Sequence, residues 1–207
     1  MGGEFSEDAA WTAAGRVEAW AGEVRVNLIR LVAIAALYGH HLLNRYAFRV
    51  ELPAGYHAGV TAIAGAWTLA ALALHIGLSR QWNPPWLKFA ALAFDALMIA
   101  ALLVLSDGPR GPFFMLLFLL IGTAPLRLDL RLVWAATIFA ILAFAFACGH
   151  DRWVRKLPEK DRLPRHQQVI VVIGLACAGL LAGQVTRQAR RFAQDYADRM
   201  KPEEPAA

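Results

Sequence analysis

The chain has 207 residues, of which 58% are hydrophobic and 18% are charged, and its mean hydropathy is +0.42. The apolar residues gather in long blocks, which excludes an ordinary soluble domain and indicates an integral membrane protein. The net charge of +5 is carried by Lys and Arg residues that flank these blocks. A lipid bilayer is therefore the expected partner of the basic residues, and nucleic acid is not.

Six apolar blocks have about the length of a transmembrane helix, for which a bilayer requires roughly 17 to 25 residues. They cover Val26–Leu43, Ala58–Leu78, Trp86–Leu105, Gly111–Leu126, Leu132–Cys148 and Val169–Val185. Each block is continuously apolar, without the alternation of apolar and polar positions that strands of a membrane barrel show. The sequence predicts an all-α fold, with a bundle of about six transmembrane helices over residues 26–186.

Residues 1–25 form a more polar leader, which we expect to be cytoplasmic. Within it, Val17, Trp20 and Val24 fall on one helical face. This pattern fits a short amphipathic helix on the membrane surface, and it fits a plain solvated leader equally well.

The distribution of basic residues predicts the orientation of the bundle. With six spans, both termini and the loops after spans two and four share one side, which carries 12 Lys and Arg. The other side carries nine, six of them in the single loop Asp151–Arg165. With that loop set aside, the positive-inside rule places both termini in the cytoplasm of a bacterial-type inner membrane.

Residues 187–207 form a cytoplasmic tail that continues the helical periodicity of the last span. A stripe of apolar residues runs along it, made of Val185, Ala189, Phe192 and Tyr196. Such a seam is typical of helices that pack on a neighbouring helix. We expect the segment 187–200 to contact a second copy of the chain or another membrane or signalling protein.

Five of the six histidines fall on the non-cytoplasmic side by the same parity: His40, His41, His57, His150 and His166. Imidazole is the commonest nitrogen ligand of metals, so a haem, copper or zinc site is one interpretation. The spacing carries no metal signature, since adjacent His40 and His41 project about 100° apart on a helix. We favour interfacial histidines that bond water, headgroups or loop carbonyls.

Two charged residues lie within the apolar blocks. Asp95 is near the middle of the third block, where an unpaired carboxylate is costly. We expect it either to take part in proton or ligand chemistry or to be paired with another helix inside the bundle. Arg30, near the start of the first block, is expected to snorkel to the membrane interface.

The stretch SDGPRGPFF, residues 106–114, joins the third and fourth blocks. Its two prolines stiffen it, and Asp107 and Arg110 give it two opposite charges. A stiff, charged turn between two membrane helices indicates a shaped surface and a candidate ligand site. No phosphate loop, nucleophile elbow, zinc helix or paired cysteine motif occurs in the chain, so an enzyme is not expected.

Asp95 in the third block, followed by this loop, resembles the six-helix membrane input domain of RegB/PrrB-type and PilS-like sensor histidine kinases. The resemblance covers roughly residues 26 to 190. In that family an acid lies in the third helix and a Gly-Gly-x-x-Asn-Pro-Phe loop follows it. Gly108, Pro112 and Phe113 match this motif, whereas Asp107 replaces the first Gly and Gly111 replaces the Asn.

The resemblance implies a sensory domain that binds a hydrophobic or redox ligand, in one branch a quinone, near the outer helix ends. The candidate ligand-binding residues are Asp95, Asp107, Gly108, Arg110, Pro112 and Phe113. Among them, Arg110 is chosen by its proximity in the loop, as a hypothetical donor in place of the missing Asn. A helix shift would then pass to the tail. No histidine follows His166, so we do not expect a histidine kinase in this chain by itself. The alternatives are a non-catalytic subunit of a respiratory or photosynthetic assembly and a small histidine-rich haem or metal protein.

Overall fold

The computed structural model describes residues 4–49, 55–80 and 84–199, and every regular element within them is helical. The six α-helices are α1 (Glu4–Leu42), α2 (Tyr56–Ser79), α3 (Pro85–Leu105), α4 (Met115–Thr123), α5 (Leu130–Trp153) and α6 (Arg165–Arg199). Five short helical turns extend or join them: η1 (Leu43–Ala47), η2 (Gly108–Arg110), η3 (Pro112–Phe114), η4 (Ala124–Arg127) and η5 (Glu159–Asp161). The predicted all-α fold is confirmed.

Five helices are long and apolar enough to cross a bilayer, which makes the chain a multi-pass membrane protein. These are Trp20–Ala47, Tyr56–Ser79, Trp86–Leu105, Leu130–Trp153 and Glu159–Asp195. The fourth predicted span is shorter than the others: its apolar run is Pro112–Arg127, and only nine residues of it are α-helical. Pro125 has no N–H to continue the helical ladder, and the chain turns there in the 3-10 helix η4.

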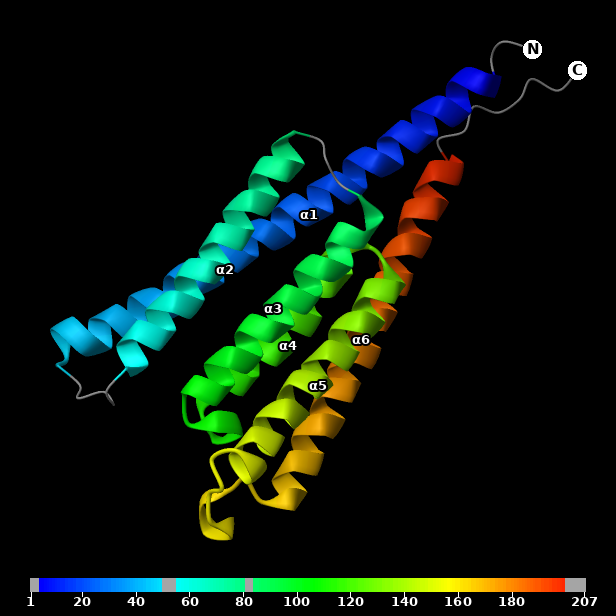
Figure 1. The fold of residues 1–207 in the computed structure, drawn as a ribbon. Helices are drawn as coiled ribbons and strands as arrows, with labels where there is room; N and C mark the ends of the chain where they lie inside the picture. Colours follow the sequence, from blue (N-terminus) through cyan, green and yellow to red (C-terminus); the bar gives the residue numbers. More distant parts are fainter. Residues whose placement is uncertain (1–3, 50–54, 81–83, 200–207) are drawn as a thin grey trace, which may run out of the picture.

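The hairpin of α1 and α2 lies beside a four-helix bundle of α3 to α6 (Figure 1). Helix α1 begins and α6 ends at one end of the molecule, the terminal end (Figure 1). The connections 106–114 and 154–164 lie at the opposite end, the loop end. Helix α1 passes residue 25 without a break, so the predicted leader and first span form one helix instead of two separate elements.

Helix α5 is the centre of the bundle, packed against α3 and α6. Ala136 and Ala140 are fully buried on it. On α6, a Cβ at Gly179 would overlap the side chain of Thr137, so the two backbones approach closely there. Small residues of this kind let helices pack in lipid, where no hydrophobic force drives them together.

Candidate functional site

Buried polar side chains from three helices meet in the interior of the structure. Arg30 Nε donates to Asp95 Oδ1 at 2.7 Å, and Arg30 Nη2 donates to Asp95 Oδ2 at 2.5 Å. The Trp67 indole N–H donates to the same Oδ1 at 2.8 Å, and Arg30 Nη1 donates to Asn27 Oδ1 at 2.7 Å. All four residues are buried. The carboxylate inside the apolar bundle is thus paired and hydrogen-bonded, which offsets the cost of placing it there.

The expectation that Arg30 snorkels to the interface is wrong. Its side chain is 6% exposed, because Asp95 on α3 offers a bidentate partner inside the bundle. Of the two alternatives expected for Asp95, the structure shows the pairing with another helix, and a role in proton or ligand chemistry stays a prediction. One sequence signal was available: Glu23, Asn27 and Arg30 recur at the spacing of one helical face, and all three are buried on α1.

Glu23 belongs to a second group of buried charges, toward the terminal end. Its Oε1 lies 3.2 Å from Arg127 Nε and 3.9 Å from Lys88 Nζ. Among the described residues, Glu23 Oε1 and Arg127 Nε have no aligned hydrogen bond, so their contact is electrostatic and not directional. The neighbouring Gly22 brings α1 against η4, since a Cβ there would lie 2.7 Å from the Leu126 carbonyl oxygen.

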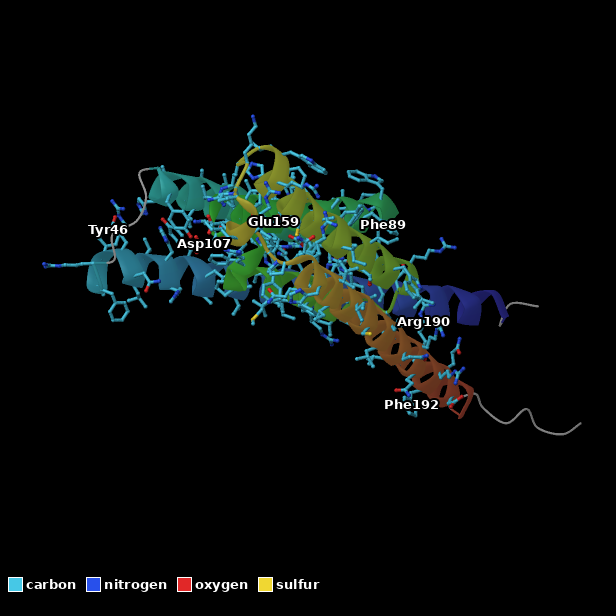
Figure 2. All side chains as sticks on the ribbon, turned by 90° about the horizontal axis from the view of Figure 1, so that it is seen from below. Tyr46, Phe89, Asp107, Glu159, Arg190 and Phe192 are labelled. Atoms are coloured by element: carbon cyan, nitrogen blue, oxygen red, sulfur yellow. The ribbon has the colours of Figure 1, made fainter. Side chains whose placement is uncertain are left out.

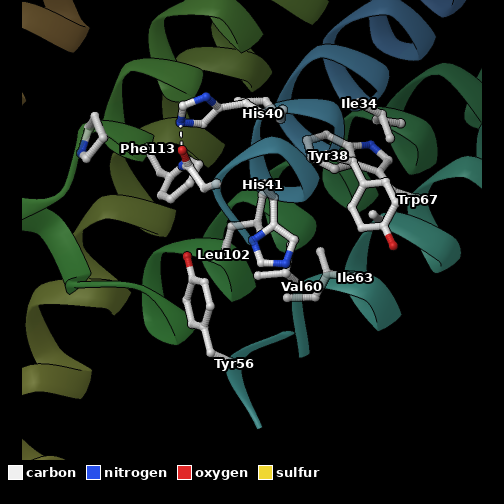
Figure 3. A pocket seen from close by; sticks show the side chains of 14 residues that line it. Ile34, Tyr38, His40, His41, Tyr56, Val60, Ile63, Trp67, Leu102 and Phe113 are labelled. Atoms are coloured by element: carbon white, nitrogen blue, oxygen red, sulfur yellow. Dashed lines mark hydrogen bonds between the residues drawn. The ribbon is translucent and has the colours of Figure 1, made fainter. Parts of the chain in front are cut away.

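A cavity of about 210 Å³ lies toward the loop end, between the α1–α2 hairpin and the bundle (Figure 3). Its walls are largely apolar and include Ile34, Val60, Ile63 and Leu102. Its polar lining residues are Tyr38, His40, His41, Asn44 and Tyr56. This volume is several times the roughly 30 Å³ that one water molecule occupies in the liquid, so a ring-sized molecule fits. Apolar walls with a few convergent polar groups are typical of small-molecule sites.

The His41 ring organises the polar side of the cavity. Its Nε2 lies 2.9 Å from His57 Nδ1, and the Tyr56 ring meets it edge-on with centroids 5.7 Å apart (Figure 3). The Tyr38 hydroxyl is satisfied by Thr61 Oγ1 at 3.2 Å. By contrast, the Tyr56 hydroxyl has no hydrogen-bond partner within the part of the chain that the structure describes. Tyr56 therefore offers a donor to a bound molecule.

The predicted ligand-binding residues divide into two groups. Pro112 and Phe113 line the cavity together with His40 and His41, so the structure joins the predicted loop to two of the five predicted histidines. Asp95 is connected to the cavity through one residue, because Trp67 both lines it and donates to the carboxylate. Sequence reasoning did not single out Trp67 or Tyr56.

Asp107, Gly108 and Arg110 do not line this cavity. Arg110 Nη2 donates to the carbonyl oxygens of Lys160, at 2.8 Å, and of Arg162. Gly108 has φ of +66°, a conformation that favours glycine, and any Cβ there would overlap the Asp151 carboxylate. Asp107 is exposed. These contacts tie the 106–114 loop to α5 and to the α5–α6 connection, and the guanidinium of Arg110 is occupied there.

The five predicted histidines do not form one site. His41 and His57 pair at the cavity, and His40 Nε2 lies 3.0 Å from Asn44 Nδ2. His150 is on α5 beside Phe146, and His166 is exposed on α6. Within residues 4–49, 55–80 and 84–199, no three His, Cys, Asp or Glu side chains are grouped so as to hold a metal ion.

Comparison with known proteins adds no relative. No protein-family model, no curated protein and no solved structure matches the chain. We therefore infer function from the cavity and the polar network.

Proposed function

We propose that this membrane protein is a non-catalytic sensor of a small lipid-soluble ring compound, such as a quinone, which binds in the cavity between the hairpin and the bundle. The observation that carries the proposal is the Tyr56 hydroxyl, which has no hydrogen-bond partner among the described residues and whose ring packs on His41, in a cavity with apolar walls. A quinone has a flat apolar ring and carbonyl acceptors, which complement aromatic walls and an O–H donor. The resemblance of the 106–114 loop to a quinone-sensing loop supports the proposal, since Pro112 and Phe113 line this cavity.

Trp67 connects the ligand to the membrane interior. Its ring lines the cavity, and its N–H donates to Asp95, which holds Arg30 of α1. A ligand that shifts the indole changes the hydrogen bonds of an ion pair between α1 and α3. The ligand moves this equilibrium only through its difference in affinity for the two arrangements. A contact with Trp67 that is made better in one arrangement than in the other provides such a difference.

Two further contacts lead from α1 to the tail. Glu23 on α1 pairs with Arg127 of η4, and Arg190 of α6 donates to the Leu128 carbonyl oxygen at 2.6 Å. Arg190 lies where α6 projects beyond the bundle (Figure 2). A shift of α1 along its axis therefore acts on η4 and, through Leu128, on the tail. This series of contacts is the route that we propose for the signal.

Retention of ubiquinone by the detergent-purified protein tests the site. Tyr56→Phe removes the O–H donor that we assign to the ligand and should weaken ubiquinone binding roughly fivefold, the value of one hydrogen bond. Tyr38→Phe is the matched control, because the Tyr38 hydroxyl lines the same cavity but is bonded to Thr61. Ala64→Trp should abolish retention by filling the cavity. Unchanged retention in both Tyr56→Phe and Ala64→Trp would exclude this site.

We also propose a bacterial-type inner membrane and a cytoplasmic terminal end. The excess of Lys and Arg at that end supports this orientation once the 151–165 loop is set aside. A variant without native cysteines can be labelled in intact cells with a membrane-impermeant thiol reagent that crosses the outer membrane. A Glu159→Cys residue at the loop end should react, and Arg187→Cys should react only after lysis. The opposite pattern would reverse the orientation.

A second candidate function is a subunit of a larger membrane assembly or of a homo-oligomer. The observation that favours it is the predicted stripe on α6, where Val185 is 55% and Phe192 is 73% exposed (Figure 2). The side chain of Tyr196 lies outside the described residues. Phe192→Glu should reduce any oligomer or co-purifying chain seen after mild-detergent purification. A monomer with no co-purifying chain in the unmodified protein would exclude this candidate.

A further inference from the structure

A second, larger cavity of about 740 Å³ lies between the loop-end halves of α5 and α6, under the 154–164 connection. It shares no lining residue with the cavity assigned to the ring compound. Its two long walls are a stripe on each helix, with Phe144, Cys148 and Arg152 on α5 and Arg165, Val169 and Ile173 on α6, and Ala145 lies next to Phe144 in the α5 wall. Helical periodicity places each set of three on one face.

The cavity has a charged end and an apolar end. Arg152 and Arg165 stand at the loop end, with Arg162 of the connection beside them in the lining. Toward the membrane interior the same stripes become apolar, with Phe144 and Ile173. Arg152 and Phe144 are eight residues apart on α5, which is about 12 Å along a helix. A groove of this length and polarity matches a phosphate headgroup followed by the first part of an acyl chain.

The charge balance favours an anion at the loop end. Arg152 and Arg165 are exposed, and neither has an acidic partner within 4.0 Å among the residues that the structure describes. Of the two acids in the lining, Asp151 is buried and already paired with Arg155 at 3.3 Å, which leaves Glu159 as the other. Three guanidinium groups against one unpaired carboxylate give the headgroup end a net positive charge. Clusters of this kind attract anionic lipids.

Trp153 marks the depth of this site. Its side chain lines the cavity and is 72% exposed, and its ring lies against Gly149, where an added Cβ would come within 2.8 Å of the ring. Tryptophan is enriched at the level of lipid headgroups. The arginines and the indole therefore lie at the depth where a phosphate group would be expected.

We propose that this groove binds one anionic phospholipid, with its phosphate on Arg152 and Arg165 and one acyl chain along Val169 and Ile173. We assign a lipid and not a free phosphate ion, because a phosphate ion would leave the apolar half of the groove empty, whereas an acyl chain fills it. The proposal does not depend on the ring compound in the other cavity. The lipid would lie under the 154–164 connection. Arg110 of the 106–114 loop bonds to the same connection, through the carbonyl oxygens of Lys160 and Arg162.

Native mass spectrometry of the full chain in detergent, with added phosphatidylglycerol or phosphatidylcholine of the same acyl chains, tests the proposal. We expect phosphatidylglycerol to bind more tightly. Arg152→Gln/Arg165→Gln should weaken its binding about thirtyfold, from the attraction of two arginines near a lipid surface. Arg45→Gln/Arg49→Gln is the matched control, since it removes the same charge from exposed loop-end positions outside the cavity. Its binding should stay within about twofold of the unmodified protein.

Ala145→Trp tests the acyl-chain half, because it fills the apolar end without changing any charge. It should also weaken phosphatidylglycerol binding about tenfold, by removing buried apolar area. Equal binding of the two lipids, or equal loss in the arginine pair and its control, would overturn the proposal. Displacement of phosphatidylglycerol by millimolar inorganic phosphate would show a bare anion site and would overturn it too.

Discussion

Two helix interfaces in this protein are built from opposite chemistry. Helix α5 meets its neighbours through small residues such as Ala136 and Ala140, and through the close approach at Gly179. Helix α1 meets the bundle through charged and polar groups, with Arg30 on Asp95 as the central contact. Closely packed small residues fit together in one relative position of the two helices. A few directional hydrogen bonds can be replaced by other hydrogen bonds when the helices shift. This difference supports the proposed route, in which the signal passes through the polar contacts of α1 and not through the closely packed helices of the bundle.

The largest effect on stability is expected when only one partner of the buried Arg30–Asp95 ion pair is removed. Asp95→Ala leaves the Arg30 guanidinium buried without its partner, and we expect a loss of about 3 to 5 kcal/mol in the free energy of unfolding. Unfolding in detergent, followed by circular dichroism, measures it. Replacing both partners, as Arg30→Leu/Asp95→Leu, should recover most of the loss, since no charge is then left unpaired. If the double variant were less stable than Asp95→Ala, the pair would not be the source of the effect.

A smaller loss is expected where the small-residue interface is overfilled. Gly179→Ala places a methyl group on the Thr137 side chain, which should cost about 1 to 3 kcal/mol in the free energy of unfolding. Gly65→Ala is the control, because nothing lies within 4 Å of its added Cβ. The same detergent unfolding experiment measures both. Equal stability of the two variants would show that α5 and α6 are not closely packed at Gly179.

The sequence predicted the spans well because continuous apolar blocks determine membrane helices by composition alone. It overestimated the fourth helix, where Pro125 introduces a 3-10 turn. The count of spans placed Pro112, Phe113, His40 and His41 on one side of the membrane, and all four line one cavity. The number of spans predicts on which side of the membrane a residue lies, but it does not predict which residues are in contact. It therefore could not show that Arg110 bonds to the α5–α6 connection.

The contacts of Arg30 and Trp67 were not predicted because their partner on α3 is remote in sequence. Arg30 is 65 residues from Asp95, and Trp67 is 28 residues from it. The long side chain of an arginine near the end of an apolar block allows either snorkelling or pairing. Which of these occurs depends on what the facing helix presents, and that is a property of the packed bundle.

The smallest effect on stability is expected at Trp67, which lines the ligand cavity and donates to Asp95. This residue also tests most directly which of the two helix interfaces carries the signal. Trp67→Phe keeps a ring in the cavity wall but removes the donor to Asp95, so we expect a loss of about 1 kcal/mol. Ubiquinone should still bind but should no longer change hydrogen exchange in residues 187–199. Trp134→Phe, an exposed position on α5, is the control and should keep that response. A preserved response in Trp67→Phe would mean that the signal bypasses the polar interface and crosses the small-residue interface instead.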